Sequence, residues 1–260
     1  MTNSEEIDRI QREKDFHNKR FADDHEHEDR QAQEKYYAAI SDCFEAYHDR
    51  VTELAKGADV LEYGCSNGDR SLELAPQAKS VVGIDISDIA IERASQLALE
   101  AGLTNSKFHA MNAEEMTFED NSFDLVFGSG ILHHLDLEKS MNEIRRVLRP
   151  GGKAVFVEPL GHNPVFNLYR MVTPNARSVD EHPLLRKDFR LFDEVMGGGD
   201  HKLYGLGTLA VVPFRNTPLK SPLFAVTRLV DKMVLQIPGV KWGAWYALME
   251  GSADAVDMAA

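Results

Sequence analysis

The stretch DVLEYGCSNGD, residues 59–69, decides the fold. Residues 59–65 are rich in apolar side chains and predict a strand, and a helix is expected to begin at about residue 69. Between them, Gly64 and Gly68 allow the backbone to turn tightly and to approach a ligand closely. In an open α/β sheet the ligand lies beyond the carboxyl ends of the strands, so this turn is the first candidate for a binding site.

The chain that follows alternates between strands and helices. Near-continuous apolar strands separated by amphipathic helices indicate a parallel sheet that is covered on both faces. We therefore predict an α/β fold, a Rossmann-like, doubly wound and mostly parallel sheet. The strands are expected at 80–86, near 106–111, at 123–128 and at 152–158, and the helices at about 88–101 and 137–149.

The chain before this region is expected to be helical. Residues 1–30 are dominated by charged and amide side chains, which suits a solvated helix or an arm. From about 31 to 56 apolar residues recur every three or four positions, and Gly57 is expected to end that helix. We predict an N-terminal helical arm or cap over residues 1–57.

The chain after residue 159 is less regular. A helix is predicted near 184–196, and an apolar helical face lies between Pro222 and Pro238. A closing strand is expected within 242–249. We therefore predict one domain over residues 58–260, with an elaboration around the acceptor site and a C-terminal lid at about 159–240.

Composition and charge exclude several classes of protein. The 260 residues include 29 Lys+Arg and 42 Asp+Glu, a formal charge of −13, which disfavours nucleic acids and anionic membrane surfaces as partners. Cys43 and Cys65 are far apart and form neither a disulfide framework nor a zinc pattern. No apolar signal region and no membrane span are apparent. We predict a cytoplasmic protein with no stable membrane insertion.

The residues around the turn favour one kind of ligand. Glu62 and Asp69 flank it, and such acids would repel a pyrophosphate but suit a ligand that carries an ammonium and a sulfonium. Asp85 ends the second strand about twenty residues on, where it can accept hydrogen bonds from ribose hydroxyls. The G-x-G-x-x-G spacing of dinucleotide sites is absent.

In its motifs the sequence resembles the class I S-adenosylmethionine-dependent methyltransferases, in particular the large group that methylates small molecules. The resemblance covers about 59–160 and implies a seven-stranded sheet. Ser66 stands where that family has the middle glycine of its loop. The matching motifs are the loop at 62–68, the segment 83–87, Asn112-Ala113-Glu114, the segment from 123–128 to His133-His134, and the turn at 148–152.

The resemblance also implies a cofactor and the residues that hold it. S-adenosyl-L-methionine would be the cofactor and S-adenosyl-L-homocysteine the product. The loop would hold the methionine end of the donor, and Asp85 would hold the ribose. The segment at 112–114 would contact the adenine edge, and Ile86 would pack against the adenine face. The segment at 129–130 would lie beside the reacting methyl group. The cofactor-binding candidates are Glu62, Gly64, Cys65, Gly68, Asp85, Ile86, Asn112, Ala113, Glu114, Ser129 and Gly130.

A sulfonium is an intrinsically strong methyl donor, so the protein has mainly to place an acceptor in line in a dry pocket. A general base helps when the acceptor is a hydroxyl or a carbon acid, and His133, His134 and Glu158 are the catalytic candidates. Two alternatives stay open: the doublet is a common helix start in the family, and Glu158 anchors the loop that begins at Pro159.

Further candidates lie outside the strand ends. Tyr36, Tyr37, His162 and His182 are expected to contact the substrate, with core packing as the alternative for the two tyrosines. The acids and histidines at 25–28 alternate along a charged helix and do not converge, so we expect no metal site.

The sequence thus predicts a metal-independent enzyme that methylates oxygen, nitrogen or carbon of a small, fairly apolar molecule. A protein or RNA methyltransferase, and a non-catalytic regulatory protein that binds the donor, stay as alternatives. The apolar residues at 203–237 are expected to line an acceptor pocket or to form a subunit interface. A homo-oligomer would form through these residues or through the N-terminal arm. Attachment of 222–237 to a membrane with a lipid-like acceptor is a weaker option.

Overall fold

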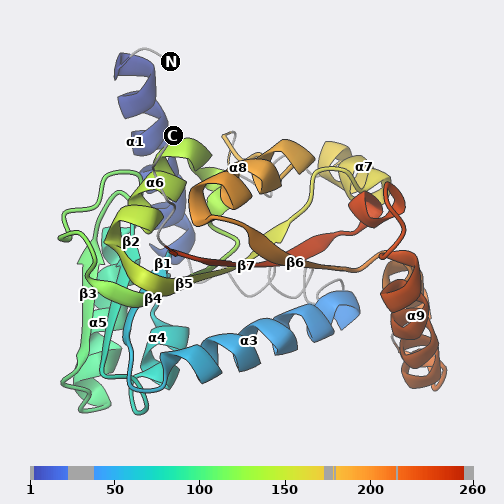
Figure 1. Ribbon diagram of the computed structural model, residues 1–260, viewed down its shortest axis with the longest axis horizontal. Coiled ribbons are helices and arrows are strands. Elements are labelled where there is room, and N and C mark those ends of the chain that lie inside the picture. The colour runs from blue at the N-terminus through green and yellow to red at the C-terminus, as the bar shows by residue number, and fades with distance from the viewer. Residues whose placement is uncertain (1–2, 23–37, 173–177, 179, 215, 255–260) are drawn as a thin grey trace.

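A seven-stranded sheet runs through the centre of the computed structural model, which describes residues 3–22, 38–172, 178, 180–214 and 216–254 (Figure 1). Strands β1 to β5 pair with one another in parallel, whereas β7 is antiparallel to both β5 and β6. The predicted mostly parallel, seven-stranded fold is therefore confirmed. The order is β3-β2-β1-β4-β5-β7-β6, with β1 (Asp59–Tyr63), β2 (Ser80–Asp85), β3 (Ser106–Ala110), β4 (Phe123–Ser129), β5 (Leu148–Pro159), β6 (Gly199–Tyr204) and β7 (Tyr246–Ser252).

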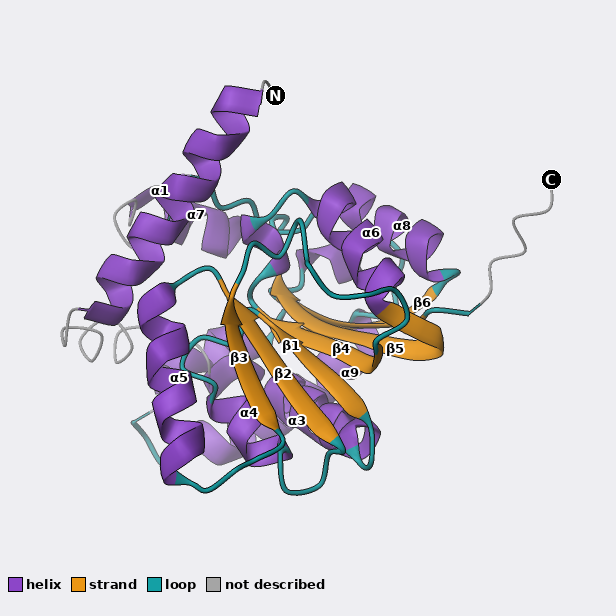
Figure 2. Cartoon of the chain, turned by 90° about the vertical axis from the view of Figure 1, so that its left-hand side faces the viewer, coloured by secondary structure: helices purple, strands orange, loops and turns teal. Residues whose placement is uncertain are grey.

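Helices cover both faces of the sheet (Figures 1 and 2). On one face, α6 (Leu137–Val147) and α8 (Arg186–Met196) share a core with Phe156 of β5. On the other, α3 (Ser41–Ala55) and α4 (Asp69–Leu74) share a second core with Val155 and Val157. Neighbouring residues of β5 thus alternate between two buried faces, which explains why the strand is apolar throughout.

The remaining helices lie around this layered body. Helix α5 (Asp88–Glu100) packs against β2 and β3 at one edge. At the far end of the molecule, α9 (Lys220–Val234) packs against the 3-10 helix η4 (Thr208–Phe214) (Figure 1). The other elements are α1 (Asn3–Ala22), α7 (Pro164–Val172) and the short 3-10 helices η1 (Ala38–Ile40), η2 (Leu132–His134) and η5 (Val240–Gly243).

The structure adds elements that were not located in the sequence. Within the apolar residues at 203–237, Leu203 and Tyr204 end β6, and the 3-10 helix η4 follows. Strand β6 was not located from the sequence. It lies at the edge of the sheet and carries Asp200, His201 and Lys202, so it lacks the apolar character of the inner strands. Helix α7 lies in a stretch predicted to be irregular and begins at Pro164, a residue that is tolerated in the first turn.

Other boundaries shift by a few residues. The closing strand begins at Tyr246 because a 3-10 turn occupies Val240–Gly243. Gly197 ends α8 in a left-handed conformation, as the sequence predicts. The predicted tyrosine pair Tyr36 and Tyr37 and the segment 25–28 lie outside the described residues. Among the helices that are described, none has both the length and the apolar character needed to cross a membrane.

Candidate active site

The turn after β1 needs both of its glycines. Gly64 and Gly68 have φ angles of +77° and +78°, which side chains rarely adopt. A Cβ at Gly64 would also lie 2.8 Å from the Ile131 side chain, and one at Gly68 would lie 2.8 Å from Phe108. Ser66, between them, takes a left-handed conformation as well, with φ +48°. The chain therefore holds this turn in a tight form at the carboxyl end of the sheet.

Asp85 is fixed beside this turn. One carboxylate oxygen accepts a hydrogen bond from the Ser66 amide at 2.9 Å, and the other accepts one from the Ser87 amide at 2.9 Å. The side chain is half-buried at the end of β2, so it still borders solvent. Ile86, which follows it, is half-buried too. An acid that is oriented in this way can accept hydrogen bonds from a neighbouring diol.

Glu62 is buried under the turn. Its carboxyl accepts hydrogen bonds from the amide and the hydroxyl of Ser71, at 2.9 and 2.6 Å, and so ties β1 to α4. Burial raises the pKa of Glu62 to about 8, against the hydrogen bonds from Ser71, which lower it. In the absence of a bound cation, Glu62 is therefore largely protonated at neutral pH. Cys65, on the same turn, is buried, and burial raises the pKa of its thiol.

The segment after β3 is held by its own side chains. The Asn112 amide oxygen accepts a hydrogen bond from the Glu114 amide at 3.0 Å, and the Tyr63 hydroxyl donates to the Ala113 carbonyl at 2.5 Å. The Glu114 carboxylate accepts two hydrogen bonds from Arg9, at 2.6 and 2.5 Å, and one from the Asp136 amide at 2.7 Å. The predicted adenine-edge residue Glu114 is thus engaged by the N-terminal helix.

That helix, α1, lies across the carboxyl end of the sheet (Figure 2). Besides the Arg9 contact, the Ser87 hydroxyl donates to the Asn18 amide oxygen at 2.6 Å, and Lys14 pairs with Asp88 at 2.7 Å. Arg9 also donates to the His134 carbonyl at 3.3 Å. The site therefore includes α1 residues that sequence reasoning missed, because a charged helix with few apolar positions gives little sign of what it covers.

His133 and Glu158 form a buried pair beyond the ends of β4 and β5. Glu158 is 0% exposed; one of its oxygens accepts hydrogen bonds from the Ile131 and Leu132 amides, both at 2.9 Å. The other oxygen lies 2.7 Å from His133 Nδ1. Beside them, Gly130 has φ +63°, and a Cβ there would lie 3.7 Å from His133 Cε1. The Cε1 atom of the imidazole therefore lies near Gly130.

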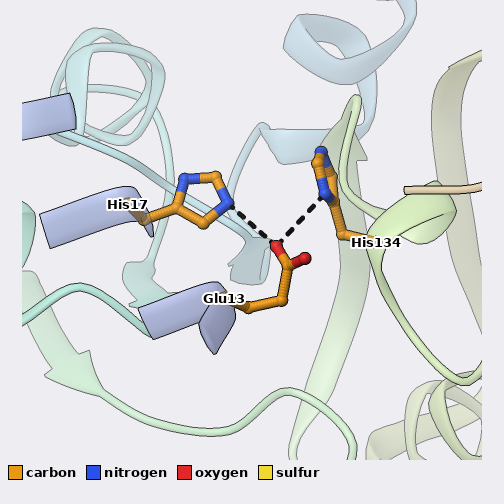
Figure 3. A group of neighbouring side chains, drawn as sticks. All are labelled: Glu13, His17 and His134. Atoms are coloured by element: carbon orange, nitrogen blue, oxygen red, sulfur yellow. Dashed lines mark ion pairs between the residues drawn. The ribbon is translucent and has the colours of Figure 1, made fainter. Parts of the chain in front are cut away.

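His134 has different neighbours (Figure 3). Its Nδ1 lies 3.4 Å from a carboxylate oxygen of Glu13, and His17 Nε2 lies 3.5 Å from the same oxygen. The two adjacent histidines thus contact carboxylates from opposite sides of the site, one from β5 and one from α1. Contrary to the prediction, they do not begin a long helix: they form the end of η2, and α6 begins at Leu137 after an Asp136 cap.

The other predicted residues are distributed as follows. Ser129 is exposed at the end of β4, close in sequence to Gly130. The amide of His182 donates to the His133 carbonyl at 2.8 Å, which brings this exposed residue to the site. His162 is exposed, and its described contacts are the Arg186 amide at 3.1 Å and the Trp242 ring. Those contacts belong to the α8 side of the fold and include none of the residues above.

Known proteins resemble this chain over the region that carries the site. A family model described as a methyltransferase domain matches residues 54–193. The uncharacterized methyltransferase YcgJ of Bacillus subtilis is 33% identical over 100 residues, 38% of this chain and 40% of that protein. A demethylmenaquinone methyltransferase of Listeria monocytogenes serotype 4a is 32% identical over 159 residues, 55% of this chain and 67% of that protein. The match thus spans less than half of the first relative's length and about two thirds of the second's.

A solved structure agrees with the fold. The crystal structure of geranyl diphosphate C-methyltransferase from Streptomyces coelicolor A3(2), which contains geranyl diphosphate and S-adenosyl-L-homocysteine, superimposes with a TM-score of 0.59 at 13% identity. The superposition covers 80% of this chain and 79% of that one. At so low an identity the likeness concerns the fold alone.

Proposed function

This chain belongs to the methyltransferase-domain family, as its motifs predict, and from that premise we propose that it methylates a small, fairly apolar molecule. The donor is S-adenosylmethionine, the cofactor that the family assignment supports. The observation that carries the proposal is the buried His133–Glu158 pair beside Gly130, at the same edge of the sheet as the glycine turn and Asp85.

The residues at the strand ends fit the donor. The left-handed backbone at Gly64 and Gly68 brings the turn close to a ligand without intervening side chains. Asp85, oriented by two amides, is placed to accept hydrogen bonds from ribose hydroxyls. Gly130 leaves room beside His133 for the methionine part. When bound, the donor supplies an electrophilic methyl group on a positively charged sulfur.

His133 is proposed as the general base. The Glu158 carboxylate accepts hydrogen bonds, so the proton of the imidazole lies on Nδ1 and Nε2 keeps a free lone pair. As the acceptor attacks the methyl group, its proton moves to His133 Nε2, and the methylated acceptor and S-adenosylhomocysteine leave. Glu158 stabilises the imidazolium that forms, so it acts as a positioning residue for His133.

An apolar acceptor is supported by the surface of α7. Val165, Leu168 and Met171 are 63%, 63% and 78% exposed on a helix that follows closely after Glu158. Apolar side chains left open beside a candidate active site suit a ligand that is itself apolar. The demethylmenaquinone methyltransferase of Listeria monocytogenes serotype 4a, which is 32% identical over 159 residues, is named for an acceptor of this kind.

Turnover tests this proposal. The purified chain is incubated with S-adenosylmethionine and a panel containing an isoprenoid quinone, a sterol, a prenyl diphosphate and an extract of the host cell. We expect S-adenosylhomocysteine to form together with one acceptor that is heavier by one methylene unit. His48→Ala, an exposed change on α3, should leave the rate unchanged. Tight donor binding with no turnover on the whole panel would instead favour a non-catalytic, donor-binding protein.

A further inference from the structure

The side chain of Glu13 is an anomaly on the inner face of α1. It is only 6% exposed, and both of its carboxylate oxygens are buried with no hydrogen-bond partner among the described residues. A buried carboxylate in this state is costly unless a cation or a set of donors compensates it. Arg9, one turn away on α1, makes its described hydrogen bonds elsewhere: its Nη2 donates to both oxygens of Glu114, and its Nη1 donates to the His134 carbonyl.

The neighbours of Glu13 are arranged as ligands around a common point (Figure 3). His134 Nδ1 and His17 Nε2 lie 3.4 and 3.5 Å from the same Glu13 oxygen, and the ligand atoms of all three residues lie within 4.8 Å of one another. These separations are long for hydrogen bonds. In a tetrahedral zinc site with bonds of about 2.0–2.2 Å, two ligand atoms stand about 3.3–3.6 Å apart, which matches the two shorter separations.

We propose that Glu13, His17 and His134 bind a divalent transition-metal ion of the zinc type. Two imidazoles and one carboxylate form a donor set that suits zinc and leaves one position of a tetrahedron open. The Ser178 hydroxyl, 3.4 Å from His134 Nδ1, adds a further oxygen at the border of the group. The site does not depend on the proposed methyl transfer. Two of its three ligands, Glu13 and His17, come from α1, which lies outside the range that the family model matches.

A neighbouring group is a weaker candidate. His133, His134 and Glu181 also lie close together. However, the Glu181 carboxylate already pairs with Arg170 at 2.7 Å. Among these carboxylates, it is Glu13 that has two buried oxygens without hydrogen bonds, which favours the group on α1. An ion there fastens α1 to η2, next to the proposed base.

Metal titration tests the site directly. The full-length protein is treated with a chelator, dialysed, and titrated with ZnCl₂ in competition with a chromogenic zinc indicator. We expect one ion per chain. Outer-shell changes cost about 10–100-fold in metal affinity, so loss of a ligand in Glu13→Gln or His17→Ala should cost about 100-fold or more. His48→Ala, an exposed histidine on α3, is the matched control and should bind as the unchanged protein does.

A measurement on the unchanged protein guards against variants that fail to fold. CoCl₂ is added to the metal-free chain, and the visible spectrum is recorded. Intense absorption of the kind that tetrahedral Co²⁺ gives, abolished by added ZnCl₂, is the expected result. Weak absorption alone, no stoichiometric zinc binding, or equal zinc affinity in folded Glu13→Gln would each overturn the proposal.

Discussion

The strand ends and α1 contribute to the same site in different ways. At the strand ends, the carboxyl groups of Asp85 and Glu158 are held by backbone amides at 2.9 Å, and His133 adds a bond at 2.7 Å. On α1, Arg9 makes one strong ion pair, whereas Glu13 has no hydrogen bond to any residue that the structure describes. The strand ends therefore have the fixed geometry that catalysis requires, while α1 is attached mainly through charged groups.

The largest expected effect separates the two adjacent histidines. His133→Gln should lower kcat by about 10²–10⁴-fold, the usual contribution of a general base. His134→Gln should lower it less, because His134 Nδ1 faces α1. Single-turnover rates with the identified acceptor, together with donor affinity by calorimetry, make the comparison. Equal losses in the two variants would argue against His133 as the base.

The two carboxylates should differ in stability. Glu158→Ala removes three hydrogen bonds from a fully buried group and should lower the free energy of unfolding by about 3 kcal/mol. In metal-free protein, Glu13→Ala removes no hydrogen bond among the described residues and should cost less than Glu158→Ala. Urea unfolding at a fixed pH measures both. A larger loss of unfolding free energy in Glu13→Ala than in Glu158→Ala would contradict the contrast between α1 and the strand ends.

Glu62 should make stability depend on pH. Its pKa rises from 4.5 to about 8 on folding, so between these values the unfolded chain has released a proton that the folded chain still holds. Stability therefore falls as pH rises through this interval, by about 4 kcal/mol. Glu62→Gln removes this contribution. The free energy of unfolding of the variant should therefore change less between about pH 5 and about pH 8 than that of the unchanged protein. Parallel pH profiles for the two proteins would show that Glu62 is not the source.

The smallest of these effects concerns the attachment of α1. Arg9→Met leaves the buried Glu114 carboxylate without its cationic partner, which is energetically costly. Release of α1 exposes Glu114 to water and so relieves this cost. Hydrogen exchange in residues 5–22 should become faster by an amount equivalent to about 1–2 kcal/mol, while β1 keeps its protection. Arg12→Met, which removes an exposed pair with Asp180, is the matched control. Equally fast exchange in Arg9→Met and Arg12→Met would contradict the role of Arg9 in attaching α1.

The strand ends could be predicted from the sequence because their signals are local. Gly64, Gly68 and Asp85 follow strands that are recognisable by their apolar character, so the chain order alone brings them to one edge. His133 and Glu158 were each singled out, but their pairing was not, since it depends on the register of β4 and β5 and on the turn at η2.

The α1 contact could not be predicted in this way. Arg9 and Glu114 are 105 residues apart, and no spacing rule relates them. The same holds for Glu13, His17 and His134, which are brought together only by the fold, so their positions in the sequence indicate no metal site. Strand β6 was missed for a related reason: its pairing with β7 forms it, despite a sequence with little strand character.

The central claim, that the strand ends bind S-adenosylmethionine, is tested most directly by calorimetric titration of Asp85→Asn. We expect one donor site per chain in the unchanged protein. In the variant, the binding free energy should fall by about 1.5–3 kcal/mol, the usual contribution of a hydrogen bond to a charged group. Asp88→Asn, three residues on and 58% exposed, should bind as tightly as the unchanged protein. Equal affinity in a folded Asp85→Asn variant would contradict the assignment of the site.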